Sequence, residues 1–403
     1  MTQGSLRRHL LVPALALGLL QGLCAPAARG TDIDWRLSGF ATLGAVYTRS
    51  DTLQFARVGI DAPGGQRTDL GPDSVLGVQA DVRLSERNAF VLQLVTRETQ
   101  RGDYDPRPAL AFLSHALSPE LTLRAGRFRS PFFMLSDTSD INYNQVWVRP
   151  PVEVYGLNPF SDIDGIDLLY RTHIGDMFVE LHPYFGRSRI PVINGGQARL
   201  SKLGGMTLTL ESGSLSLSAG YAKADLAVER TSPGFVDFAS TLPQALRAEL
   251  SGSGASASFS SLGMQWDDGV WRFSAEVARN TASKFSNSAT AAYASAGRRF
   301  GSVMPYLSVA RQWQDQPLVE AAEWPGYEDR IKGFNRSRNQ AQKSFSVGMR
   351  WDFAPSAALK AEFTQARTSR NALGTFIARE DPFAPGLDRR TINLLSVSVD
   401  VVF

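Results

Sequence analysis

The chain has 403 residues, and its 42 Lys and Arg against 39 Asp and Glu give a formal net charge of +3. This slight basic excess forms no run of Lys and Arg, so we expect no nucleic-acid partner. The single cysteine, Cys24, lies near the N-terminus, which excludes a disulfide framework and a Cys-based metal site from the rest of the chain. No motif for a metal or another cofactor is present, and we expect none.

The N-terminus has the pattern of a secretory signal peptide. Two arginines precede an apolar stretch from 10 to 23, which small residues follow. An anchoring helix is the alternative, but the stretch is short for a membrane span of roughly 20 residues. A lipidation signal prefers a small residue before the cysteine, and Leu23 is bulky. We therefore expect residues 1–30 to be removed and residues 31–403 to form one transmembrane β-barrel.

Apolar and polar residues alternate in many segments after residue 34. Within 75–86, Leu76 and Val78 alternate with Gly77 and Gln79. A period of two is typical of a strand with one apolar and one polar face. The pattern predicts sixteen strands. They are expected near 34–48, 75–86, 88–97, 108–117, 120–128, 164–173, 176–185, 203–211, 214–226, 256–267, 270–280, 289–300, 302–313, 343–353, 357–367 and 391–403.

The connections between these segments alternate between tight turns and longer polar stretches. The tight turns are expected at 86–87, 118–120, 174–176, 212–214, 267–269, 300–302 and 353–356. A soluble β-sandwich also has two-faced strands, but its Greek-key crossings do not place every long loop at one end. An even number of strands of about 10 residues with unlike ends is typical of a membrane barrel. The predicted fold is therefore an all-β, antiparallel, up-and-down transmembrane barrel.

The chain ends inside a strand pattern. Leu395, Val397, Val399, Val401 and Phe403 alternate with Ser396, Ser398 and Asp400, and only Val402 breaks the pattern. An unpaired edge is not viable in a bilayer, so we expect the last strand to pair with the first. Several aromatic residues lie beside predicted tight turns or at the termini, which predicts an interfacial girdle at one rim. They are Trp35, Trp266, Trp271, Phe300, Trp351, Phe353 and Phe403.

With these features, the chain resembles Gram-negative outer-membrane porins, most specifically in the stretches 121–133 and 146–162. Phe403 matches the aromatic C-terminus by which that class is recognised during assembly. The resemblance implies a location in the bacterial outer membrane, among its lipid and lipopolysaccharide. It also implies insertion by the barrel-assembly machinery, a homotrimer, and a water-filled channel for passive diffusion of small hydrophilic solutes and ions.

The third long connection, 129–163, is the expected constriction loop, because the third loop of general porins folds into the barrel and narrows the pore. Its aromatic and apolar residues are better placed against a lumen wall than in water. Ser130 and Pro131 have the pattern of a helix start, with serine as N-cap and proline in the first turn.

The resemblance further implies arginines on the wall facing carboxylates on this loop. The wall candidates are Arg83, Arg97, Arg124, Arg127 and Arg171, and the loop candidates are Asp137, Asp140, Glu153 and Asp162. Strict alternation directs Arg124 into the lumen and Arg127 outward, whereas the Gly-Arg pair of the family directs Arg127 inward. A bulge near Gly126 would reconcile the two. The alternative for any one of these arginines is a charge at the rim of the barrel that simply faces water. Ion selectivity stays open, with a slight preference for anions.

Two other functions are alternatives to a general porin. A solute-specific channel would have a binding site at the constriction, where Tyr143, Trp147 and Tyr155 are the candidate contacts. An outer-membrane hydrolase would need a nucleophile with a base in reach. The histidines after the signal peptide, His115, His173 and His182, lie in no such motif. We therefore expect a protein that is not an enzyme.

Overall fold

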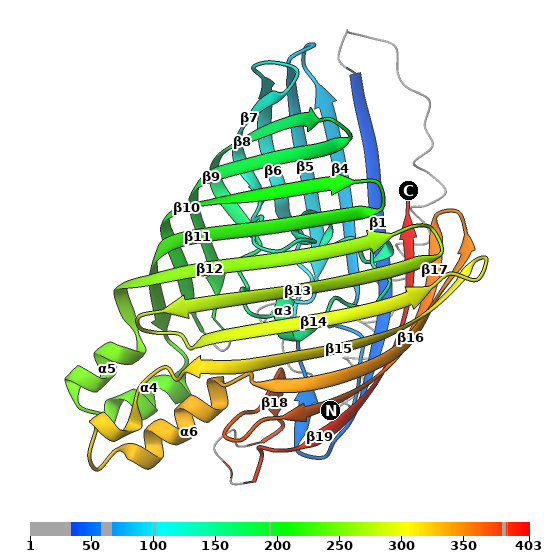
Figure 1. The fold of residues 1–403 in the computed structure, drawn as a ribbon. Coiled ribbons are helices and arrows are strands. Elements are labelled where there is room, and N and C mark those ends of the chain that lie inside the picture. The colour runs from blue at the N-terminus through cyan, green and yellow to red at the C-terminus, as the bar shows by residue number, and fades with distance from the viewer. Residues whose placement is uncertain (1–33, 58–66, 100–101, 193–194, 381–383, 385) are drawn as a thin grey trace.

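The computed structural model describes residues 34–57, 67–99, 102–192, 195–380, 384 and 386–403, so the expected signal peptide lies outside the described residues. One sheet of 17 strands includes the two-residue β3 (Thr68–Asp69), and its other sixteen strands close into an antiparallel barrel (Figure 1). These sixteen are β1 (Asp34–Arg49), β4 (Val75–Arg83), β5 (Asn88–Arg97), β6 (Arg107–Ala116), β7 (Leu121–Arg129), β8 (Asp162–Ile174), β9 (Met177–Pro191), β10 (Gly196–Ser212), β11 (Leu215–Arg230), β12 (Gly252–Asp267), β13 (Trp271–Ala282), β14 (Ser288–Arg298), β15 (Val303–Gln316), β16 (Gln342–Ala354), β17 (Ala357–Thr368) and β19 (Thr391–Val402).

The last strand closes the barrel on the first, as the sequence predicted. β19 pairs with β1 from Asn393 opposite Arg49 to Val402 opposite Phe40. Beyond this ladder, Gly39 N donates to Phe403 O at 2.7 Å and Phe403 N donates to Gly39 O at 2.9 Å. The sheet therefore has no free edge between its two ends, which satisfies the backbone polar groups of both strands.

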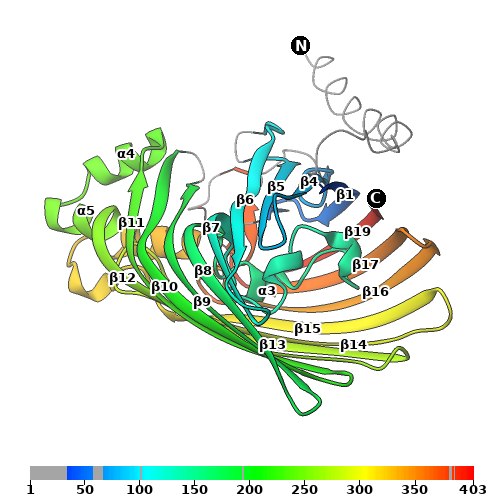
Figure 2. The same cartoon turned by 90° about the horizontal axis from the view of Figure 1, so that it is seen from above.

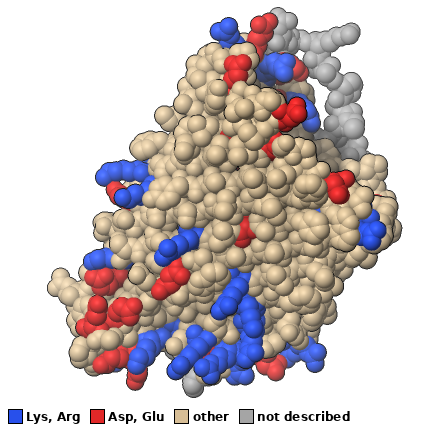
Figure 3. Space-filling model, in the orientation of Figure 1, with Lys and Arg blue, Asp and Glu red and all other residues tan. Residues whose placement is uncertain are grey.

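The outer face of the wall is apolar. Leu262, Leu307 and Leu395 are 59%, 51% and 55% exposed, while neighbours such as Ser308 are buried. Figure 3 shows few charged side chains across the middle of the wall and a gathering of them toward its lower left, near the helices labelled in Figure 1. Because strand alternation separates the two faces, the apolar set lies outside and the polar set inside. The aromatic residues beside the tight turns are exposed, as the predicted girdle requires.

The seven tight turns all fall where the sequence predicted them. One of the longer connections is much shorter than expected, since β9 continues to Pro191 and β10 begins at Gly196. The register of β10 shifts between Ser201 and Gly204, and Lys202 has a φ of 48°. This bulge interrupts the alternation, so the pattern across 186–202 did not read as strand.

The remaining connections carry short elements. β2 (Leu53–Phe55) pairs with β18 (Phe376–Ala378). Figure 2 shows α4 (Pro233–Ser240) and α5 (Gln244–Leu250) at one side of the barrel, between β11 and β12. η3 (Ala321–Glu323) and α6 (Glu328–Arg338) join β15 to β16. No helix within the described part of the chain has the length and apolar character needed to cross a membrane.

The connection from β7 to β8 contains η1 (Ser136–Thr138), η2 (Asn142–Asn144) and α3 (Val152–Tyr155). The expected helix start at Ser130 is wrong. Ser130 Oγ instead donates to the carbonyl of Phe160 at 2.5 Å, which ties the beginning of this connection to its end. The short α-helix starts later, directly after Pro151.

Candidate functional site

Residues 130–161, called the β7–β8 segment below, are fastened to the polar face of the wall. Trp147 Nε1 donates to Ser295 Oγ on β14 at 3.0 Å, and Tyr155 Oη donates to Glu276 on β13 at 2.7 Å. Both partners are buried and lie on the face opposite the exposed apolar residues. Two adjacent strands of the wall therefore hold the same segment.

A buried lysine fixes the middle of the segment. Lys360 Nζ on β17 donates to the carbonyl of Asn142 at 2.5 Å and to that of Trp147 at 2.9 Å. The same ammonium lies 2.9 Å from the carboxylate of Asp400 on β19, which also accepts a bond from Thr42 on β1 at 2.7 Å. One cation thus connects the segment to the strands at which the barrel closes.

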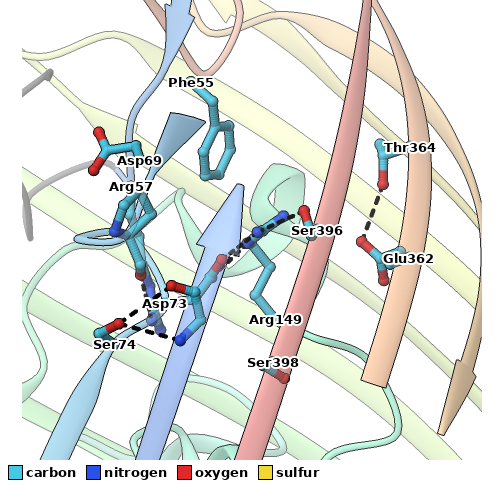
Figure 4. Close-up of polar contacts among 12 residues, drawn as sticks. Phe55, Arg57, Asp69, Asp73, Ser74, Arg149, Glu362, Thr364, Ser396 and Ser398 are labelled. Carbon is cyan, nitrogen blue, oxygen red and sulfur yellow. Dashed lines mark hydrogen bonds and ion pairs between the residues drawn. The ribbon is translucent and has the colours of Figure 1, made fainter. Parts of the chain in front are cut away.

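Arg149 makes a second connection to β19 and also contacts the connection that precedes β4. Figure 4 shows its guanidinium directed at Asp73 and Ser396, with Phe55 nearby. Arg149 Nε donates to Asp73 at 2.7 Å, Nη2 donates to Ser396 Oγ at 2.9 Å, and the guanidinium lies 4.7 Å from the centre of the Phe55 ring. Nη2 also contacts the second carboxylate oxygen of Asp73, and such a bidentate contact fixes orientation as well as distance.

Glu153 in α3 is buried with an amide as its partner. Gln342 Nε2 on β16 donates to the Glu153 carboxyl at 2.7 Å. Burial raises the pKa of Glu153, whereas hydrogen bonds from Ser344 and Gln342 act in the opposite direction. The carboxyl is therefore held within the packing of the segment and is not directed at an open channel.

Two arginines converge on one carboxylate of the segment. Arg97 on β5 donates to Asp140 at 2.6 Å, and Arg129 at the end of β7 contacts the other oxygen of Asp140. All three side chains are buried. The sequence named Arg97 and Asp140 as members of the constriction, and the structure brings them together.

Arg124 and Arg127 each have an acidic partner on β8. Arg124 donates to Asp167 at 2.9 and 2.5 Å, and Asp167 also lies 2.8 Å from Nε2 of His182. Arg127 donates to Asp164 at 2.7 and 2.9 Å. The register of β7 runs unbroken past Gly126 on both sides, so β7 has no bulge there that would reconcile the two directions weighed for Arg127.

A cavity of about 130 Å³ lies between the wall and the β7–β8 segment. Tyr155, Ser130, Ser136 and Ser139 contribute hydroxyl groups to its lining. Its charged lining residues are Arg57, Arg97, Arg107 and Arg189, with the carboxylates of Asp140 and Asp162. Four arginines against two aspartates give the cavity a positive balance, which attracts small anions.

Other candidate residues lie elsewhere. Arg83 is exposed at the end of β4 beside a tight turn, and Arg171 pairs with Glu180 at 2.6 Å with half of its side chain exposed. Asp137 is exposed on the segment. Tyr143 donates to the carbonyl of Pro355 at 2.9 Å. Trp147 is only 1% exposed, so it packs within the segment and presents no open face to a solute.

Several of the strongest contacts were not found from the sequence. Lys360, Asp73, Arg129 and Asp164 were not singled out, although Lys360 is a lone lysine in an apolar-alternating strand. Its position on the polar face was a usable signal, because long charged residues are rarely buried without a partner. In the described part of the chain, no three His, Cys, Asp or Glu residues gather as a metal site.

No protein-family model and no curated protein matches the sequence. Solved structures match it over nearly its full length. The outer membrane channel DcaP of Acinetobacter baumannii is similar with a TM-score of 0.55 and 12% identity, over 94% of this chain and 100% of that one. Salmonella typhi OmpF, solved with daunomycin, is similar with a TM-score of 0.54 and 13% identity, over 92% of this chain and 97% of that one. An anion-selective porin from Comamonas acidovorans is similar with a TM-score of 0.53 and 12% identity, over 92% of this chain and 100% of that one.

These likenesses rest on the path of the backbone, since the identities are low. The matched proteins are outer-membrane porins and channels. This chain itself is a closed antiparallel barrel with an apolar outer face. The chain therefore has the fold of the outer-membrane porins, a closed barrel of sixteen antiparallel strands.

Proposed function

We propose that this protein is an outer-membrane channel through which small hydrophilic solutes cross by passive diffusion, with a preference for anions. The observation that carries the proposal is the cavity beside the β7–β8 segment, whose charged lining is four arginines and two aspartates. The segment lies in the lumen and acts as its constriction. Its fastening to β13, β14, β17 and β19 supports this assignment.

Transport through such a channel needs no chemical step. A hydrated solute loses part of its water shell at the constriction, and arginine and hydroxyl groups replace the lost contacts. The surplus of positive charge lowers the energy of an anion there and raises that of a cation. We therefore propose no enzymatic activity and no cofactor.

The same proposal covers targeting and assembly. Residues 1–30 direct export, the barrel-assembly machinery reads Phe403, and the mature barrel sits among outer-membrane lipid and lipopolysaccharide. Three copies form a homotrimer, for which a solved trimer of the similar Vibrio cholerae OmpT, at a TM-score of 0.52 and 10% identity, gives support. The share of each chain that this match covers is 93% here and 100% there.

Single-channel recording in a planar bilayer tests the proposal. The refolded mature protein should conduct in steps that group in threes, and a KCl gradient should give a reversal potential of the sign for anion preference. Arg107→Gln and Arg189→Gln should each move that potential toward cation preference. Lys332→Gln, on the exposed side of α6, removes the same charge outside the cavity and should leave it unchanged. A folded barrel without current, or a cation-selective one, would contradict the proposal.

A further inference from the structure

The wall reverses its polarity at the ends of β10 and β11 that lie away from the tight turn between these two strands. On the outer face, Arg199 lies 3.5 Å from Glu229 and Lys202 lies 3.0 Å from Asp225, and all four side chains are exposed. The inner positions between them are apolar and buried, Leu200 among them. A lumen that held only water and ions would not favour an apolar inner wall.

This inner patch borders a cavity of about 200 Å³, called the apolar cavity below. Alanines line much of its wall, including Ala198, Ala222 and Ala224, and their short side chains leave room for a ligand. The β7–β8 segment closes the cavity with Phe132 and Phe160. Because the lining belongs to the inner face, a ligand reaches this cavity from the aqueous lumen and not from the bilayer.

A second cavity of about 180 Å³, called the polar cavity below, adjoins the first. The two share six lining residues, which are Leu157, Pro159, Arg230, Asn280, Phe285 and Ser286. The polar cavity adds Arg338 from α6, amide side chains from β15, and further amides from the connections that precede β14 and follow α6. An apolar and a cationic compartment therefore meet at Arg230.

The polar cavity contains buried polar atoms that have no hydrogen-bond partner among the described residues. They are Nε of Arg230, Nε of Arg338, Oδ1 of Asn287, Oε1 of Gln312 and Nε2 of Gln314. A buried polar atom that has no hydrogen-bond partner destabilises the fold, so such atoms are usually paired. Five such atoms around one cavity indicate that a polar ligand or ordered water occupies it.

The two arginines favour an anion as that ligand. The other nitrogens of Arg230 donate to the carbonyls of Leu250 and Phe285, the latter at 2.8 Å, and Arg338 lies over the ring of Phe334 at 5.5 Å. Within the described residues neither guanidinium forms an ion pair with a carboxylate. Burial lowers the pKa of Arg338, which shows that nearby carboxylates do not offset its desolvation.

We propose that the two cavities together form a binding site for a small amphipathic monocarboxylate. Its carboxylate lies between Arg230 and Arg338 in the polar cavity, and its ring or short acyl chain enters the apolar cavity. The aqueous lumen delivers it. This site goes beyond passive diffusion, because it retains one chemical class of solute beside the pore.

Calorimetric titration of the refolded barrel in lipid nanodiscs tests the site with three probes. Benzoate has both a carboxylate and an apolar ring, benzamide lacks the charge, and acetate lacks the ring. Benzoate should bind at least tenfold more tightly than either of the others, since a charge-assisted hydrogen bond and a buried ring each contribute more than the equivalent of a tenfold change. Equal binding of benzoate and benzamide, or of benzoate and acetate, would overturn the proposal.

Three variants locate the binding. Arg338→Met should weaken benzoate binding about tenfold or more, because its guanidinium has no described hydrogen bond on which the fold depends. Ala224→Leu fills the apolar cavity and should abolish benzoate binding without creating binding of benzamide. Arg330→Met removes a charge from the exposed side of the same helix and should change nothing. Unchanged binding of benzoate in Arg338→Met and Ala224→Leu would overturn the proposed binding site. Channel conductance is a separate measurement, and it tests the proposed channel function alone.

Discussion

Lys360 on β17 and Asp400 on β19 form an ion pair of 2.9 Å in which neither side chain is exposed to solvent. The register places Ala358 opposite Asp400 and Lys360 opposite Ser398, so the pair is diagonal across two adjacent strands. Because Lys360 also donates to two carbonyls of the β7–β8 segment, one ammonium joins barrel closure to the position of the segment.

Replacing Lys360 by methionine should therefore be strongly destabilising. The substitution leaves Asp400 buried without its cation, and removing one partner of a buried pair costs about 3–5 kcal/mol. Urea unfolding from lipid vesicles measures this loss. Lys343→Met, at an exposed position of β16, is the matched control and should change the free energy of unfolding by less than about 0.5 kcal/mol. Equal losses in the two variants would contradict a structural role for the pair.

Glu98 gives the protein a pH dependence near neutrality. It follows the end of β5, and burial, together with the negative charge of Asp69, raises its pKa to about 7. The unfolded chain has a value near 4.3, so the native state binds this proton more tightly. Its contribution to stability is complete below about pH 4.3 and is lost as the pH rises through 7.

The urea midpoint of the wild-type barrel should therefore fall between pH 5 and pH 8 by more than that of Glu98→Gln, whose amide does not titrate. Most other carboxylates are already ionised in this range, so the difference between the two proteins isolates Glu98. Parallel curves for the two proteins would show that Glu98 does not carry the effect.

The fold could be predicted from the sequence because a membrane barrel imposes one pattern on every strand. Leu307 and Ser308, or Val397 and Ser398, have opposite environments in the structure, and their alternation is visible in the sequence. The same argument placed β19 beside β1. The alternation of polar and apolar residues did not predict the first part of β10, because the inner face of that strand is apolar at Leu200 and Leu203.

The site was predicted less well, because its contacts join residues far apart in the sequence. Arg97 and Asp140 were named and lie together, but Arg149 with Asp73 and Lys360 with Asp400 depend on the path of the β7–β8 segment. Composition does not determine that path. An aromatic residue such as Trp147 also has no sequence feature that separates a packed side chain from one that contacts solute.

The apolar outer face should not tolerate charge at mid-wall. Leu307 on β15 is 51% exposed, and an arginine there would lie in the hydrocarbon region, at a cost of about 2–4 kcal/mol. Ser201→Arg is the control, because Ser201 is exposed on the polar end of β10 and faces Asp225 in the register. Unfolding from vesicles should separate the two variants. If Ser201→Arg lost as much free energy of unfolding as Leu307→Arg, the hydrocarbon region would extend to position 201 and the prediction would be contradicted.

The ring of Phe403 should stabilise closure of the barrel by covering Gly39. A Cβ at Gly39 would lie 2.4 Å from the Phe403 ring and 2.8 Å from the carbonyl of Gly77, so Gly39→Ala displaces the ring and strains the first ladder. Overpacking of this kind costs about 1–3 kcal/mol. Gly204→Ala is the control, since its nearest neighbour is Phe185 at 3.7 Å.

We expect Gly39→Ala to lower the free energy of unfolding in urea by that amount and Gly204→Ala to lower it much less. Because residue 403 is unchanged in Gly39→Ala, this comparison separates packing at the seam, where β1 pairs with β19, from recognition of the C-terminus during assembly. Refolding into vesicles without other proteins keeps assembly factors out of the measurement. Equal stability of the two variants would mean that the ring of Phe403 contributes nothing to the seam, and that the two backbone hydrogen bonds between Gly39 and Phe403 close it alone.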